Sequence, residues 1–163
     1  MNFLRLMTCW KISRQASINF SQLSFSNWIA GGKNSISGVG LLDLSANYKK
    51  NKIHWDNSLK AGYGLIKEGD NELMKNEDKL DLNTKLGVEM KNEHLLFSTF
   101  MNFLTQFADK YKYPNTTDKI SGLFAPAYLT IASGLDYQPS EMFSLFFTPV
   151  SGKFTFVLDD QLA

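Results

Sequence analysis

The residues with the clearest chemical potential are His54, Asp56 and Lys60, which share one face of a short alternating segment. A carboxylate beside a histidine can serve as a general base or as part of a metal site. One His and one carboxylate do not complete a metal site, however, and no recognisable nucleophile motif accompanies them. We therefore predict no catalytic, cofactor-binding or metal-binding residues, no cofactor and no enzymatic activity. We expect these three side chains to belong to a polar cluster inside the fold.

Apolar and polar residues alternate along most of the chain with the two-residue period of β-strands. Leu42, Leu44 and Ala46, for example, are separated by Asp43 and Ser45. The expected strands cover residues 12–20, 36–48, 53–65, 79–90, 95–107, 123–137, 142–149 and 154–162. Since no long apolar helix is present to cover a sheet, we predict an all-β protein. The expected architecture is an antiparallel up-and-down β-barrel of the outer-membrane type, with about eight strands present.

The connections between the expected strands alternate in length. Short charged turns are expected at residues 49–52, 91–94 and 138–141, and longer links at 21–34, 67–78 and 108–119, with 150–153 as the exception. Outer-membrane barrels have short periplasmic turns and longer outer loops. The expected strands also match the roughly 9–11 residues that cross a bilayer at a tilt. The pattern therefore predicts that the longer links lie on the outer cell face.

The two faces of the expected strands differ in character. The polar faces carry charges of both signs, and we expect them to form a polar cluster that fills the barrel interior. Its candidate members are Asp43, Asn47, His54, Asp56, Lys60, Asp81, Asn83, Lys85, Asn102 and Gln106. Aromatic residues near the strand ends suit a membrane interface, where amphipathic rings are favoured. The candidate interface aromatics are Trp28, Tyr48, Trp55 and Tyr137.

Alternation alone does not tell which face points inward. A soluble or secreted β-barrel binding module for a hydrophobic ligand has the same period, with its apolar face inside. An outer-membrane enzyme is a third class. For Trp28, a stacking platform in a ligand-binding loop is the alternative to an interface anchor. Charges on several polar faces and the segregation of loop lengths favour the membrane barrel.

Composition excludes some partners and sites. The formal net charge is +1, so electrostatics do not favour a nucleic-acid partner. The single cysteine, Cys9, excludes an intrachain disulfide framework and any multi-Cys metal site. The longest uncharged apolar run, residues 120–135, is too short for a transmembrane helix and contains Pro126.

Six motifs, in this order, resemble a family of Bacteroidetes proteins of unknown function that are regarded as outer-membrane β-barrels. They are SNWIAGGKNSISG (26–38), YKKNKIHWDNSLKAGYGLIK (48–67), EDKLDLNTKLGVE (77–89), MNFLTQF (101–107), SGLFAPAYLTIASGLDYQP (121–139) and FTFVLDDQLA (154–163). The resemblance implies a bacterial outer-membrane location, with the lipid bilayer and the barrel-assembly machinery as partners. It implies no activity, and any small-molecule ligand stays unknown. The expected role is structural, in assembly, or in small-solute transport, with a plugged polar interior.

The resemblance also bears on domain organisation. Members of the family begin with a secretion signal, which is not visible here, and continue through further strands after a segment like VLDDQLA. We therefore expect a short N-terminal segment at residues 1–10 and a single β-barrel domain at residues 11–163. This domain is expected to be a partial barrel, truncated at its C-terminus.

Overall fold

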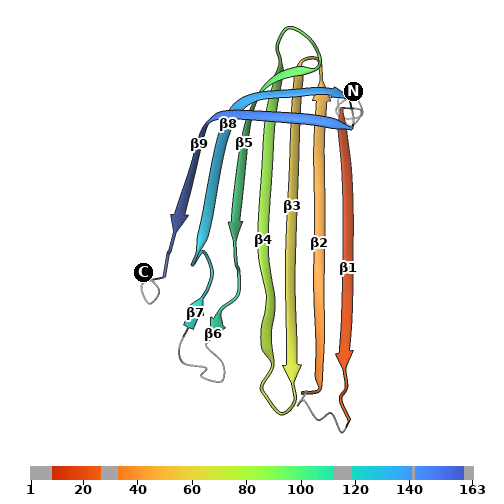
Figure 1. Cartoon of the computed structure of the whole chain (residues 1–163), viewed down its shortest axis with the longest axis vertical. Coiled ribbons are helices and arrows are strands. Elements are labelled where there is room, and N and C mark those ends of the chain that lie inside the picture. The colour runs from red at the N-terminus through yellow and green to blue at the C-terminus, as the bar shows by residue number, and fades with distance from the viewer. Residues whose placement is uncertain (1–8, 27–32, 112–118, 141, 160–163) are drawn as a thin grey trace, which may run out of the picture.

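The computed structural model describes residues 9–26, 33–111, 119–140 and 142–159. Its strands are β1 (Trp10–Leu23), β2 (Ser35–Lys50), β3 (Ile53–Glu68), β4 (Met74–Glu89), β5 (Leu95–Thr105), β6 (Lys110–Tyr111), β7 (Lys119–Ser121), β8 (Ala127–Ser140) and β9 (Phe143–Phe156). The prediction of an all-β, antiparallel protein is confirmed (Figure 1). Among the described residues, no helix is long and apolar enough to cross a membrane.

Seven strands form one sheet in the order β1-β2-β3-β4-β5-β8-β9, and β6 and β7 form a separate hairpin. Each strand of the large sheet therefore lies beside its neighbour in the chain, apart from the β6–β7 excursion, which gives an up-and-down meander. Strands β1 and β9 are the two edges of this sheet. The described sheet is not closed into a barrel.

The register places like residues side by side across the sheet. One row on the apolar face runs through Arg14, Leu44, Leu59, Leu82, Phe103, Leu129 and Phe154. The next row, on the polar face, runs through Gln15, Asp43, Lys60, Asp81, Leu104, Tyr128 and Thr155. Paired residues on neighbouring strands share a face, so the alternation of each strand adds up to two chemically distinct sheet faces. Arg14, on edge strand β1, is the exception in the apolar row.

The expected link at residues 67–78 is wrong, because β3 continues to Glu68 and β4 begins at Met74. The connection is therefore residues 69–73. A register shift opposite Gly64 and Leu65 leaves Asn76 as an extra residue in β4. An extra residue interrupts the two-residue alternation, since it shifts the following side chains to the other face. This interruption and the many charges made the start of β4 resemble a loop.

The two expected strands at 142–149 and 154–162 are also wrong, because β9 is one continuous strand through the supposed link at 150–153. Leu135 pairs with Phe147, and Ser133 pairs with Val150, so β9 has one residue more than β8 between these pairs. This bulge moves the apolar positions from odd to even numbers. Pro149 lies in the bulged part of an edge strand, a place where its missing N–H is tolerated.

The region between β5 and β8 differs from the expected link at 108–119. Strand β5 ends at Thr105, and the region contains the short β6–β7 hairpin. Pro126 immediately precedes β8, a place where its missing N–H is tolerated. One end of the sheet holds the connections 51–52 and 90–94, together with the end of β8 and the start of β9, and is called the turn end. The other end holds the connection 69–73, together with the ends of β1 and β5 and the starts of β2 and β8, and is called the loop end (Figure 1).

The sheet curls around its polar face. Near the turn end, β8 and β9 bend and cross in front of the strands between β5 and β1 (Figure 1). The bend coincides with the register shift between Ser133 and Leu135. At Gly134 an added Cβ would collide with the carbonyl oxygen of Phe147 and lie 2.8 Å from Cα of Thr148. The absence of a side chain at Gly134 therefore lets β9 approach β8 closely at the bend.

Replacing Gly134 by Ala should destabilise the fold by more than about 2 kcal/mol, because the new methyl group can be accommodated only if the main chain of β9 moves. The measurement is the free energy of unfolding by urea. Gly152→Ala is the control, since its Cβ would meet only the ring of Phe154, at 3.4 Å. Equal losses in the two variants would contradict this account of the bend.

Candidate functional site

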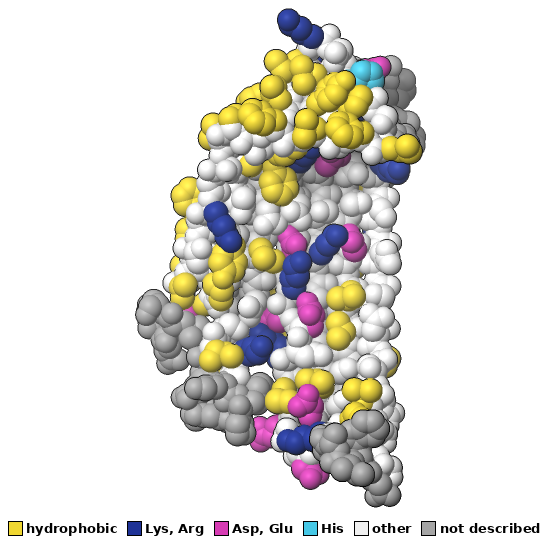
Figure 2. All heavy atoms as spheres, viewed as in Figure 1, with side chains coloured by type: hydrophobic (Ala, Val, Ile, Leu, Met, Phe, Trp, Pro, Cys, Tyr) yellow, Lys and Arg dark blue, Asp and Glu magenta, His cyan; other side chains and the backbone are white. Residues whose placement is uncertain are grey.

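The polar face of the sheet is the candidate functional site. Figure 2 looks onto this face: charged side chains occupy its middle, and apolar side chains gather near the turn end, where β8 and β9 cross. The strands position nine of the ten predicted cluster residues on this face, namely Asp43, Asn47, His54, Asp56, Lys60, Asp81, Asn83, Lys85 and Asn102. The tenth, Gln106, follows β5 and accepts a hydrogen bond of 2.6 Å from the Ser121 hydroxyl.

Charges of alternating sign meet in the middle of the polar face. Asp43, Lys60 and Asp81 lie directly opposite one another on β2, β3 and β4. The Lys60 ammonium is 3.7 Å from the Asp43 carboxylate, and Lys79 lies 3.0 Å from Asp81. Asp56 lies opposite both Asn47 and Lys85 in the register. Exposed pairs of this kind contribute about 0–1 kcal/mol each.

Asp81 also accepts hydrogen bonds from two amides of the predicted cluster. The Asn102 side-chain amide donates to the Asp81 carboxylate at 2.7 Å and to the side-chain Oδ1 of Asn83 at 2.9 Å. The Asn83 amide donates to the same Asp81 oxygen at 3.0 Å. The structure thus joins Asp81, Asn83 and Asn102 into one network across β4 and β5.

A buried ion pair lies at the turn end, where β8 and β9 pass over the polar face (Figure 1). Asp136 is fully buried, with 0% of its surface exposed, and its carboxylate pairs with the Lys85 ammonium. Lys85 reaches Asp136 across β5, which separates β4 from β8. The Gln138 amide donates to the same carboxylate at 2.8 Å, and the Lys85 ammonium lies 4.9 Å from the centre of the Phe146 ring. These contacts join β4, β8 and β9 on the polar face at the turn end.

His54 lies near the same end but is not joined to Asp56 or Lys60 in a reactive arrangement. Its Nε2 is 2.7 Å from the Glu89 carboxylate on β4. The Ser98 hydroxyl, on the same face, is fully buried, and its Oγ has no hydrogen-bond partner among the residues that the structure describes. Within the described ranges, no three His, Cys, Asp or Glu side chains gather closely enough to hold a metal ion.

A second buried ion pair, between Lys75 and Asp78, lies at the loop end of the sheet. The Lys75 ammonium is 2.5 Å from the Asp78 carboxylate and equally close to the Ala108 carbonyl oxygen. Asp78 in turn accepts hydrogen bonds of 3.0 Å from the main-chain N–H groups of Phe107 and Ala108. The pair therefore ties the segment after β5 to the start of β4.

The opposite face of the sheet is apolar and exposed. Phe20 is 81% exposed and Phe147 is 63% exposed, and the same face carries Leu82 and Leu86. The buried set in the described residues is dominated by polar and small side chains, with Leu96 as the one large apolar member. No second layer of the described structure covers the apolar face, as the single large sheet shows.

Aromatic residues gather on the apolar face at the turn end. The Trp10 ring lies 5.1 Å from Tyr48 and 5.8 Å from Trp55, centre to centre. The Trp55 indole N–H donates to the Thr84 hydroxyl at 2.8 Å. Tyr137, the third predicted interface aromatic in the described part, pairs with Leu95 on the same face. Trp28 lies outside the described residues.

Sequence reasoning missed several residues of the clusters on the two faces. Asp136 was recoverable, since it alternates with Leu135 and Tyr137 and so belongs to the polar face of its strand. Trp10 also had a signal, because it lies two residues before Ile12 in the same alternation. Lys75 and Asp78 were hidden by their assignment to a loop.

Comparisons with known proteins identify a family whose function is unknown. A family model described as "Protein of unknown function (DUF3078)" matches residues 20–111, more than half of the chain. This range contains β2–β5, which carry most of the polar face. Neither the curated proteins nor the solved structures contain a significant match.

Replacing Lys85 by Met should destabilise the protein by about 3–5 kcal/mol, because it leaves the buried Asp136 carboxylate without its counter-charge. Lys60→Met, which removes the exposed partner of Asp43, should cost less than about 1 kcal/mol. Urea unfolding of both variants checks the difference. Asp136→Asn added to Lys85→Met should recover part of the loss, and a double variant no more stable than Lys85→Met would contradict the account.

Proposed function

The chain belongs to DUF3078, a family of proteins of unknown function, and we propose that its sheet is part of a transmembrane β-barrel in a bacterial outer membrane. The observation that carries the proposal is the exposure of the apolar face of the sheet. A water-soluble sheet packs its apolar face against a second layer, since large exposed apolar areas are unfavourable in water. In a transmembrane barrel the same face contacts lipid, and the interior is polar.

The aromatic residues support a bilayer position. Tyr63 follows Trp55 by eight residues on the apolar face of β3. At about 3.3 Å per residue, the two rings are about 26 Å apart along the strand. A strand tilt of about 40° reduces this to about 20 Å along the membrane normal, close to the band of about 25 Å typical of these barrels. Trp55 and Tyr63 would thus mark the two interfaces.

Closure of the barrel follows a parity rule. Strands β1 and β9 run in the same direction, because six antiparallel steps separate them in the sheet (Figure 1). Pairing them directly would make a parallel seam, and so would joining two copies in the same membrane orientation. Bacterial barrels close with an even number of antiparallel strands, and unpaired edges are prohibitive in lipid. We therefore propose that an odd number of additional strands lies between β9 and β1.

The polar interior supports an occluded barrel rather than an open pore. The Lys85–Asp136 pair and Phe146 fill the polar face at the turn end, beneath the β8–β9 crossing. A buried pair of this kind is favourable only where its groups are satisfied by each other and by hydrogen bonds. The proposed role is thus structural, in assembly, or in binding or transfer of a small solute.

The resemblance of the six motifs to Bacteroidetes proteins supports a Gram-negative host of that group. Insertion would then use the barrel-assembly machinery, and the longer connections at the loop end would lie on the outer cell face. A soluble binding module for a hydrophobic ligand is the competing function. It requires the apolar face to be enclosed, whereas the described sheet curls toward its polar face (Figure 1).

Replacing Leu44 by Arg should lower the free energy of unfolding in lipid vesicles by about 2–4 kcal/mol, because this position lies in the apolar row between the aromatic ends. Ser45→Arg, at the next position but on the polar face, is the matched control and should cost less than about 1 kcal/mol. Unfolding with guanidinium in the presence of lipid measures both. A larger loss for Ser45→Arg than for Leu44→Arg would favour the soluble fold.

The closed protein, reconstituted in planar bilayers, should show no steady ion conductance, because the interior is filled at the turn end. Lys85→Ala combined with Phe146→Ala removes the filling groups and should produce measurable current. Large stable conductance steps from the wild-type protein would contradict occlusion and favour a diffusion pore.

A further inference from the structure

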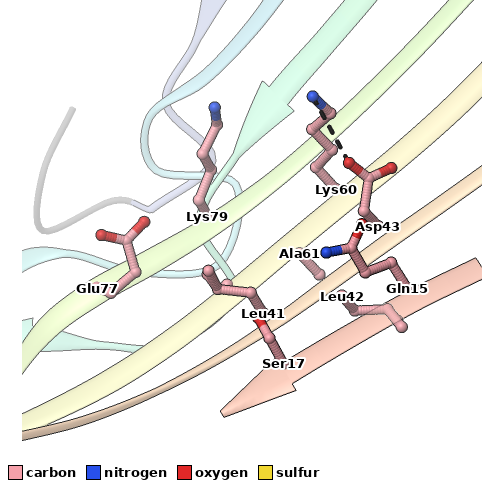
Figure 3. Close-up of a pocket in the computed structure, with 10 residues that line it drawn as sticks. Gln15, Ser17, Leu41, Leu42, Asp43, Lys60, Ala61, Glu77 and Lys79 are labelled. Carbon is pink, nitrogen blue, oxygen red and sulfur yellow. Dashed lines mark ion pairs between the residues drawn. The ribbon is translucent and has the colours of Figure 1, made fainter. Parts of the chain in front are cut away.

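A hollow opens on the polar face beside the middle row of charges, toward the loop end. It has a volume of about 280 Å³ and is lined by residues of β1 to β4, including Leu41, Gly62, Glu77 and Lys79 (Figure 3). Ligand pockets usually have volumes of about 300–1,000 Å³. The volume of this hollow is at the lower end of that range, so it suits a small ligand. The side chains that are proposed to block ion conduction, Lys85, Asp136 and Phe146, lie at the other end of the sheet.

The floor of the hollow depends on the missing side chain of Gly62. A Cβ there would lie 3.1 Å from Cδ2 of Leu41 and 3.4 Å from Cγ of Glu77. Both side chains therefore lean over the main chain of β3 from the neighbouring strands. Leu41 supplies an apolar wall, and Glu77 brings a carboxylate to the edge of the hollow.

The charges around the hollow are unequally satisfied. Lys60 and Lys79 are 56% and 46% exposed in their side chains, and their ion pairs with Asp43 and Asp81 measure 3.7 Å and 3.0 Å. Such exposed pairs are weak, so their ammonium groups remain available to a ligand. In the part of the chain that the structure describes, Glu77 makes neither a hydrogen bond nor an ion pair. The hollow thus presents a carboxylate without a counter-charge beside two ammonium groups in weak pairs.

The spacing of these charges defines the ligand. Glu77 and Lys79 are two residues apart on β4 and share the polar face, so their main chains are separated by about 7 Å. In Figure 3 the side chains of Lys60 and Lys79 rise from the same face as Glu77. A complementary solute carries an ammonium group for Glu77 and a carboxylate for the lysines, several bonds apart. A metal ion or a fatty acid has only one of these groups.

We propose that the hollow binds a short zwitterionic peptide, with its ammonium group at Glu77 and its carboxylate between Lys60 and Lys79. The size of the hollow limits the ligand to about a dipeptide. The inference goes beyond the proposed membrane location, because it concerns binding by the polar face. Its failure would leave the lipid-facing assignment of the apolar face unchanged.

The test is an NMR titration of the detergent-solubilised protein with L-alanyl-L-alanine. Two derivatives of this probe, the N-acetylated dipeptide and the dipeptide amide, each lack one charge. The wild-type protein should bind the zwitterion saturably and each derivative at least tenfold more weakly. Absence of saturable binding, or equal affinity for the three compounds, would overturn the proposal without reliance on any variant.

Variants assign the two ends of the ligand. Glu77→Gln should weaken binding of the zwitterion at least tenfold and leave the weak binding of the N-acetylated dipeptide unchanged. Lys79→Gln should weaken binding of the zwitterion at least tenfold and leave the weak binding of the dipeptide amide unchanged. Glu72→Gln, in the exposed connection between β3 and β4, is the matched control and should bind like the wild type. The same loss in Glu72→Gln, or equal losses for zwitterion and N-acetylated dipeptide in Glu77→Gln, would contradict the assignment.

Discussion

A single sheet has two faces, and the unequal chemistry of those faces governs this structure. Leu44 and Asp43 are adjacent in the chain, yet they belong to rows of opposite character that cross the sheet. One row must contact an apolar environment and the other a polar one. The curl of the sheet determines which face points inward, because β8 and β9 bend over the polar face and leave the apolar face on the outside (Figure 1). In the proposed transmembrane barrel, this exterior contacts lipid.

The polar interior has its own requirements. Charges removed from water need partners, and the structure supplies them most completely where burial is deepest. Asp136 has Lys85 and two side-chain hydrogen-bond donors, whereas Asp43, near the open middle, has one partner among the described residues, Lys60 at 3.7 Å. The gradient runs from a filled turn end to a hollow nearer the loop end. The proposed barrel would therefore be blocked at the turn end and accessible at the hollow, where Glu77 and the lysines Lys60 and Lys79 lie.

The sequence predicts the faces of the strands well and their boundaries less well, for a physical reason. Alternation is reliable while pairing is regular, so Asp43, Lys60 and Asp81 could be assigned to one face before their cross-strand alignment was known. Bulges interrupt alternation, and those near Asn76 and Thr148 produced a false loop and a false strand break. The Lys85–Asp136 pair depends on the bend at Gly134 and on strands separated by β5. No local pattern encodes such a contact.

The most direct test of the central claim is a spin-label scan along β4. Labels placed one at a time at residues 80–88 of the protein in lipid vesicles report their accessibility to oxygen, which concentrates in the bilayer, and to a water-soluble nickel complex. The account predicts a period of two, with oxygen maxima at Leu80, Leu82, Leu86 and Val88 and nickel maxima at Asp81, Asn83 and Lys85. The same period with the two reagents exchanged would contradict it, because the apolar face would then face water or the interior.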